Sequence, residues 1–93
     1  MLNLDTPLRI PTWAAFTVTQ TDTFLLNTRT NLYYALDEVG ARLWSLLTAK
    51  ESLRKCCQIL LQEYEVEPLV LEQDILALVE DLVKNGLVEV YTE

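Results

Sequence analysis

The chain has 93 residues, of which 51% are hydrophobic, with two glycines and three prolines, a composition that excludes disorder and collagen-like repeats and predicts one compact domain. Its formal net charge is −7, from 14 acidic and seven basic residues, and it contains no histidine. Because nucleic-acid affinity depends mainly on Lys and Arg neutralising phosphates, this charge argues against a nucleic-acid partner.

The first 13 residues, with Pro7 and Pro11, predict an extended arm, and residues 14–91 are predicted to form the domain itself. Hydrophobic side chains on the arm could pack on the domain surface; they are Leu8, Ile10 and Trp13. Alternating apolar and threonine residues predict a strand over residues 14–20, followed by a turn at residues 21–22.

Residues 23–27 and 32–36 predict two further strands around a polar connection at residues 28–31, so a three-stranded antiparallel meander is the simplest arrangement. In the third strand Leu32, Tyr34 and Leu36 share one face, while Tyr33 and Ala35 share the other.

Three helices are predicted to follow the meander. Asp37 is a good N-cap for the first, which ends near Thr48 and carries Trp44 on its core-facing stripe. The second covers residues 53–64, with Ser52 as its cap, and the third covers residues 69–85, where Asn85 and Gly86 stop it. Residues 87–91 alternate and predict a short last strand returning along the third helix.

The predicted fold is therefore α+β: a winged helix-turn-helix with an N-terminal three-stranded antiparallel sheet, three helices and a short C-terminal strand. Such a fold often binds DNA. However, the polar positions of the third helix, which would be the recognition helix, carry four acids against one lysine. Exposed acids would repel phosphates, so a transcription regulator is the least favoured function.

The residue types needed for catalysis or for holding a cofactor are missing. Without histidine, acid–base chemistry near neutral pH would need another group with a strongly shifted pKa, and the two glycines, Gly40 and Gly86, cannot form a phosphate-binding loop. Cys56 and Cys57 are adjacent on a predicted helix, where side chains diverge by about 100°, so we expect small core or boundary residues and no metal site. No enzymatic activity and no cofactor are expected.

No apolar run is long enough to cross a bilayer, and the first five residues lack the basic start and apolar stretch of a signal peptide. We therefore expect a cytoplasmic protein with no membrane partner.

The third helix has a wider apolar arc than one core-facing stripe requires. The arm or the last strand could cover this flank, or the flank could form one wall of a groove whose other wall is the third strand. Such a groove would suit an extended peptide, because an open strand edge offers main-chain hydrogen bonds. Two arginines could either meet acids of that peptide or be solvated or paired locally. The extra apolar residues of the helix are Leu69, Val70, Leu76 and Val83. The two arginines are Arg29 and Arg42.

Several segments together resemble the PqqD family, the precursor-recognition elements of ribosomally synthesised and post-translationally modified peptides (RiPPs). The resemblance covers about residues 14–91. It is carried by residues 25–27, the segment from Tyr33 to Trp44, the Glu63-Tyr64 pair before a break at residues 66–68, and Asp74, Leu78 and Leu82 ahead of residues 85–88.

The resemblance implies a small non-catalytic domain that binds the leader of a precursor peptide as an added strand along its third strand, beside its third helix. It also implies delivery of the precursor to a modifying enzyme. The length is similar to stand-alone members of lasso-peptide pathways, which escort the precursor to a cysteine leader peptidase and an ATP-dependent cyclase. Carried over by position, the peptide-binding residues would be Leu32, Tyr33, Tyr34, Ala35, Asp74, Leu78 and Asp81.

A competing interpretation is a structural subunit or a homodimer whose apolar flank pairs with itself. The composition, charge and periodicity do not separate this interpretation from peptide binding.

Overall fold

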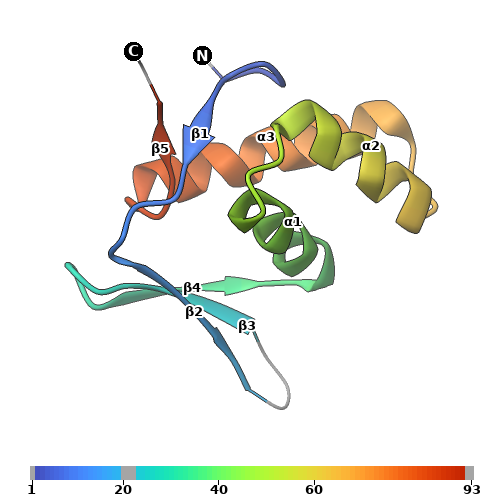
Figure 1. The fold of residues 1–93 in the computed structure, drawn as a ribbon. Coiled ribbons are helices and arrows are strands. Elements are labelled where there is room, and N and C mark those ends of the chain that lie inside the picture. The colour runs from blue at the N-terminus through green and yellow to red at the C-terminus, as the bar shows by residue number, and fades with distance from the viewer. Residues whose placement is uncertain (1, 20–22, 92–93) are drawn as a thin grey trace.

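A computed structural model of the chain describes residues 2–19 and 23–91. Three helices lie on one side of a three-stranded sheet, and a second, two-stranded sheet lies near the C-terminal part of the last helix (Figure 1). In chain order the elements are β1 Leu8–Arg9, β2 Ala14–Val18, β3 Thr23–Asn27, β4 Leu32–Leu36, α1 Glu38–Thr48, α2 Leu53–Glu63, α3 Pro68–Lys84 and β5 Glu89–Val90. The predicted α+β fold class is confirmed.

The larger sheet is an antiparallel meander with β3 in the centre and β2 and β4 at its edges. Leu25 of β3 lies opposite Phe16 of β2 and Tyr34 of β4, so these three side chains share the face toward the helices. The connection between β3 and β4 is a tight turn in which Asn31 takes a left-handed conformation, with φ 61°, and its amide donates to the carbonyl of Asn27 at 2.7 Å. The predicted turn at residues 21–22 lies outside the described residues.

The smaller sheet joins the two ends of the described chain. Leu8 pairs with Val90 and Arg9 with Glu89, and the Arg9 guanidinium donates to the Glu89 carboxylate at 3.0 Å. The arm therefore contributes a strand of its own, which the sequence pattern did not predict. The last strand pairs with this arm and is shorter than the predicted residues 87–91.

The helix boundaries follow from local capping. The Asp37 carboxylate accepts from the amide of Gly40 at 2.7 Å at the start of α1, and the Ser52 hydroxyl accepts from the amide of Lys55 at 3.2 Å at the start of α2. Pro68 begins α3, where its missing N–H costs no helical hydrogen bond. Gly86, with φ 71°, ends α3 as predicted.

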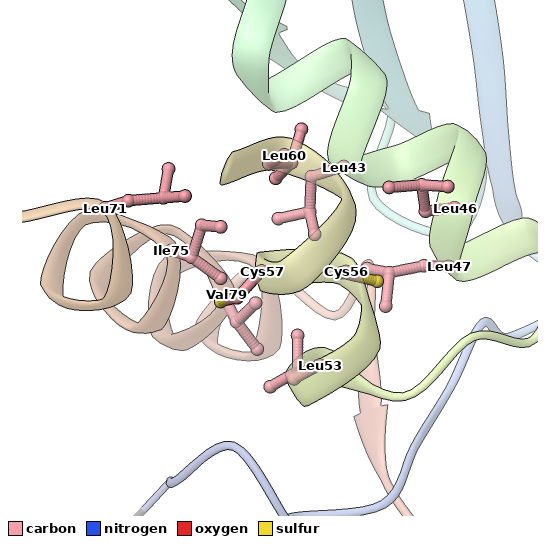
Figure 2. Packing of buried hydrophobic residues seen from close by; sticks show 10 residues of the cluster. All are labelled: Leu43, Leu46, Leu47, Leu53, Cys56, Cys57, Leu60, Leu71, Ile75 and Val79. Carbon is pink, nitrogen blue, oxygen red and sulfur yellow. The ribbon is translucent and has the colours of Figure 1, made fainter. Parts of the chain in front are cut away.

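Two groups of buried side chains hold the layers together. The first lies among the three helices, and Figure 2 shows Cys57 near Val79 of α3 and Cys56 near Leu47 of α1. The second joins the sheet to the helices and contains the predicted core residue Trp44, which is 3% exposed. The members of the second group are Leu25, Trp44, Leu82, Leu87 and Val88.

Among the described residues, no helix combines the length and the apolar character needed to cross a membrane.

Both cysteines are buried, which confirms their prediction as core residues. Burial raises the pKa of the Cys56 thiol to about 11, and the neighbouring Cys57 thiol and Glu51 add to the shift. Burial also raises the pKa of Cys57. Because the thiolate is the reactive form, neither side chain is suited to nucleophilic chemistry near neutral pH.

We predict that Ellman's reagent added to the native protein at pH 8 reacts with both thiols only slowly, because they are buried and protonated. In denaturant, both thiols should react with the reagent as fast as free cysteine does. A fast, stoichiometric reaction of either thiol in the folded protein would contradict the packing of α2 against α1 and α3.

Candidate functional site

The outer edge of β4 carries backbone groups that face away from the sheet. The amide of Thr28 donates to the carbonyl of Trp13 at 2.8 Å, so these two residues are a hydrogen-bonded pair. Because hydrogen-bonded and non-hydrogen-bonded pairs alternate along antiparallel strands, this pair fixes which backbone groups of β2, β3 and β4 face a neighbouring strand. It follows that the backbone groups of Leu32, Tyr34 and Leu36 face β3, whereas the N–H and C=O groups of Tyr33 and Ala35 point outward. No strand within residues 2–19 and 23–91 pairs with this edge.

A hollow of about 410 Å³ lies beside the end of β4, between α1 and α3. One wall comes from the end of β4 and the start of α1, and the other comes from the N-terminal half of α3. Most of the lining is aliphatic, and its two charged side chains are Asp37 and Asp74, so the hollow favours a neutral or basic occupant over an acidic one. The aliphatic residues that shape the two walls are Leu36, Val39 and Leu43 on one side, and Val66, Val70 and Leu78 on the other.

The candidate residues on β4 divide between the two faces of the strand. Leu32 and Tyr33 are 62% and 66% exposed, and Ala35 is exposed as well. The Tyr33 ring lies on the face turned away from the helices, in an edge-to-face contact with Phe24 at 6.1 Å between ring centroids. Tyr34 is half-buried under the sheet and reaches α3.

The candidate residues on α3 lie at different positions relative to the hollow. Asp74 and the half-buried Leu78 line it. Leu78 packs against both core groups as well, so it has core contacts and also a side open to the hollow. Asp81 accepts a hydrogen bond from the Tyr34 hydroxyl at 3.3 Å, which connects β4 to α3 beyond the hollow.

The Tyr34 hydroxyl is sensitive to its surroundings. Burial raises the pKa of this phenol above its usual value of about 10, and the charge and hydrogen bond of Asp81 raise it further. A raised folded-state pKa means that the stabilising contribution of the neutral phenol is fully present at neutral pH. That contribution is lost as the pH rises through the folded-state pKa.

The two arginines considered as peptide contacts are engaged within the chain. Arg42 makes two hydrogen bonds of 2.8 Å each to the Glu63 carboxylate, which lower the pKa of Glu63 and raise that of Arg42. The Arg29 guanidinium lies over the Trp13 ring, 4.4 Å from its centroid. The local-pairing alternative therefore describes both residues.

Sequence reasoning placed Val70 on the apolar flank of the third helix, but it missed Val66 as part of the lining of the hollow. Val66 and Val70 are 42% and 51% exposed, and both lie near the break before α3. Exposed valines on either side of a helix start could have signalled an apolar surface there. Val39 also lines the hollow, and its place there depends on how α1 crosses β4.

Two other places could accept an extended segment, but each offers less. No residue of β2 lines the hollow beside β4 or the larger cavity described next, so its outer edge adjoins neither of them. A larger cavity, of about 670 Å³, lies between β1 and the connection from α1 to α2. There the strand has two residues, and the alternation of its ladder directs only the groups of Leu8 away from β5. The edge of β4 therefore combines the longer open strand with an adjoining apolar hollow.

A small α+β domain with an open sheet edge beside an apolar hollow belongs to the class of folds that can accept an extended peptide as an added strand. Residues 22–88 match the family described as "Coenzyme PQQ synthesis protein D (PqqD)", and the chain belongs to this family. A comparison with curated proteins finds no match.

Two solved structures are similar to this chain over nearly its whole length. One is described as "TbiB1 in Complex with the TbiA(beta) Leader Peptide", with a TM-score of 0.82, 27% identity, and coverage of 91% of this chain and 99% of that chain. The other is "Lasso peptide synthetase B1 complexed with the leader peptide", with a TM-score of 0.81, 31% identity, and coverage of 89% of this chain and 98% of that chain. Both proteins were solved with a leader peptide bound, as their descriptions state.

We predict that Tyr34→Phe lowers the free energy of unfolding by about 0.5–1 kcal/mol, because it removes the hydroxyl that donates to Asp81. The matched control is Tyr33→Phe, since the exposed Tyr33 side chain makes no hydroxyl hydrogen bond within the part of the chain that the structure describes; it should change stability by less than about 0.3 kcal/mol. Urea unfolding monitored by circular dichroism measures both. Equal effects of the two substitutions would contradict a stabilising bond between β4 and α3.

Proposed function

We propose that this protein is a non-catalytic binding protein that captures the leader segment of a ribosomal precursor peptide as an added strand along β4. The proposal depends on the outward-facing N–H and C=O groups of Tyr33 and Ala35, next to an apolar hollow on α3. The two similar proteins solved with leader peptides support it, because their folds cover almost the same length.

The proposed mode of binding divides affinity from selectivity. Backbone pairing along β4 needs an extended peptide but makes little demand on its sequence, whereas the hollow selects a side chain that fits between Val70 and Leu78. Asp74 at the rim of the hollow favours a neutral or basic residue of the leader next to that side chain.

The expected affinity follows from a few contributions. Four net main-chain hydrogen bonds at ~1 kcal/mol each and two apolar anchors at ~2 kcal/mol each give a gross ~8 kcal/mol. The peptide must become ordered, and this entropy cost reduces the net gain. Dissociation constants in the micromolar range follow from these contributions, and tighter binding needs further anchors or a preordered groove.

The proposed binding residues have different roles. Leu32, Tyr33, Tyr34 and Ala35 supply the strand, and the exposed side chains of Tyr33 and Ala35 border the peptide on the outer face. Leu78 and Asp74 contact it from α3. Asp81 fixes Tyr34 through the hydroxyl bond, so its contribution is to orient β4 relative to the helix.

We further propose that the captured precursor is passed to modifying enzymes of a lasso-type pathway, namely a leader peptidase and a cyclase. The likeness to the protein described as lasso peptide synthetase B1 supports this pathway over others served by the PqqD family. The test is whether a short precursor gene and such enzymes lie beside this gene, and whether the precursor co-purifies with this protein. A neighbourhood without any precursor gene would favour the structural-subunit alternative.

We predict that Ala35→Pro abolishes measurable binding of the cognate leader, because it removes one outward N–H and inserts a ring at the pairing edge. The matched control is Val18→Pro at the opposite edge, where the alternation of the ladder also directs the N–H outward. Titration calorimetry with the synthetic leader should show wild-type affinity for the control. If Ala35→Pro stayed folded and bound the leader normally, β4 would not be the pairing strand.

We predict that Val70→Asp weakens leader binding by about 1–3 kcal/mol, because it removes an apolar wall of the hollow and adds a charge beside Asp74. Leu69→Asp is the control. Leu69 is 70% exposed and does not line the hollow, and its substitution adds the same charge one residue earlier. Fluorescence anisotropy of a labelled leader compares them, and equal losses would indicate a general charge effect with no contact at the hollow.

A further inference from the structure

One buried polar side chain connects the sheet to the end of α3. Asn27, at the end of β3, is 4% exposed. Among the residues that the structure describes, it is the one polar residue that is buried. Its side-chain amide donates to the carbonyl of Asn85 at 2.8 Å, and its side-chain carbonyl accepts from the amides of Arg29 at 2.9 Å and Thr30 at 3.3 Å. A single side chain therefore holds both the turn before β4 and the C-terminal end of α3.

A second bond joins the same two regions. The indole N–H of Trp13 donates to the carbonyl of Gly86 at 2.8 Å, and the guanidinium of Arg29 covers the Trp13 ring. The packing is close: a Cβ on Gly86 would lie 2.9 Å from the side-chain nitrogen of Asn27, and Gly86 has φ 71°. We call Asn27, Trp13 and Gly86 the junction.

The junction lies at the start of β4 and at the C-terminal end of α3, away from the hollow, and it connects to the proposed binding site along both walls. Asn27 pairs with Leu32, the first residue of β4, across the turn. On the helix, Asn85 lies one turn beyond Asp81, which bonds to Tyr34, and the Asn85 side chain donates to the Asp81 carbonyl at 2.8 Å. Two side-chain hydrogen bonds run from the meander strands to this end of α3. The one from Asn27 is part-buried and 2.8 Å long, and the one from Tyr34 is exposed and 3.3 Å long.

We infer that Asn27 is a positioning residue for peptide binding: through Asn85 it sets the separation between the edge of β4 and the α3 wall of the hollow. This inference rests on the proposed function. A peptide paired with β4 must also reach Val70 and Leu78, so both walls have to be in place at once. A displacement of about 1 Å between the supports of a site is enough to remove most of its effect.

Asparagine is suited to this position because both halves of its amide are used. Aspartate has nearly the same shape and keeps the acceptor for the turn, but it lacks the donor and brings a negative charge to the carbonyls at the C-terminal end of α3. Asn27→Asp therefore releases α3 while it leaves the turn bonded. Trp13→Phe is a milder variant, which removes only the indole donor to Gly86.

The experiment measures leader affinity and structure in the same four proteins: wild type, Asn27→Asp, Trp13→Phe and Cys56→Ala. Cys56→Ala controls for lost stability, because Cys56 is buried near α1 and does not line the hollow. We expect Asn27→Asp to raise the dissociation constant of the synthetic leader about tenfold or more, Trp13→Phe to raise it less, and Cys56→Ala to leave it unchanged at a temperature where all four are folded.

A double-mutant cycle with Val70→Ala separates positioning from a general structural role. If Asn27 acts by placing α3, the loss caused by Val70→Ala becomes smaller in the Asn27→Asp background, since the wall has already moved. Equal losses in the two backgrounds, or an Asn27→Asp affinity no lower than that of Cys56→Ala, would overturn the inference.

Amide spectra of the leader-free proteins give a result that does not depend on the proposed function. In ¹⁵N–¹H spectra, Asn27→Asp should shift the amide signals of residues 74–81, and Cys56→Ala should leave them in place. If wild type binds no leader, the proposed function fails while these shifts still test the positioning of α3. Unchanged α3 signals in Asn27→Asp would overturn the inference in either case.

Discussion

The structure depends on a sheet that stops at β4. The meander satisfies the inward-facing backbone groups of β4 through β3, and among the described residues no strand pairs with the outward groups of Tyr33 and Ala35. An open edge exposes a protein to unwanted pairing with other chains. Here the edge is five residues long and ends at the Asp37 cap of α1, so the number of groups exposed to such pairing is small.

The helices place an apolar hollow beside this edge. Because alternate side chains of β4 point to opposite faces, Tyr34 and Leu36 face the helices, and the second of these contributes to the hollow shared with α1 and α3. A shift of register by one residue would turn both side chains outward and would replace them with Tyr33 and Ala35. Buried Leu25 opposite Tyr34, together with Asn27 at the turn, holds the register that places the open edge of β4 beside the hollow.

Features governed by local sequence could be predicted, and features governed by tertiary contacts could not. The meander, the caps at Asp37 and Ser52, and the stop at Gly86 each follow from residues within a few positions, and all are present. The pairing of β1 with β5 was missed because two-residue strands contain no alternation to detect. The role of Asn27 was missed because an asparagine before a turn is common, and its bond to Asn85 joins residues 58 positions apart. The exposure of Val66 and Val70 depends on what covers α3, which periodicity does not reveal.

The central claim is that a leader peptide pairs with the backbone of β4, and amide hydrogen exchange measured residue by residue with and without the synthetic leader tests it most directly. The account predicts that the amides of Tyr33 and Ala35 exchange freely in the unbound protein and become protected when the leader is added, while the outward amides of β2 at Phe16 and Val18 do not change. Saturation of the protein with leader while the amides of Tyr33 and Ala35 continue to exchange freely would contradict it.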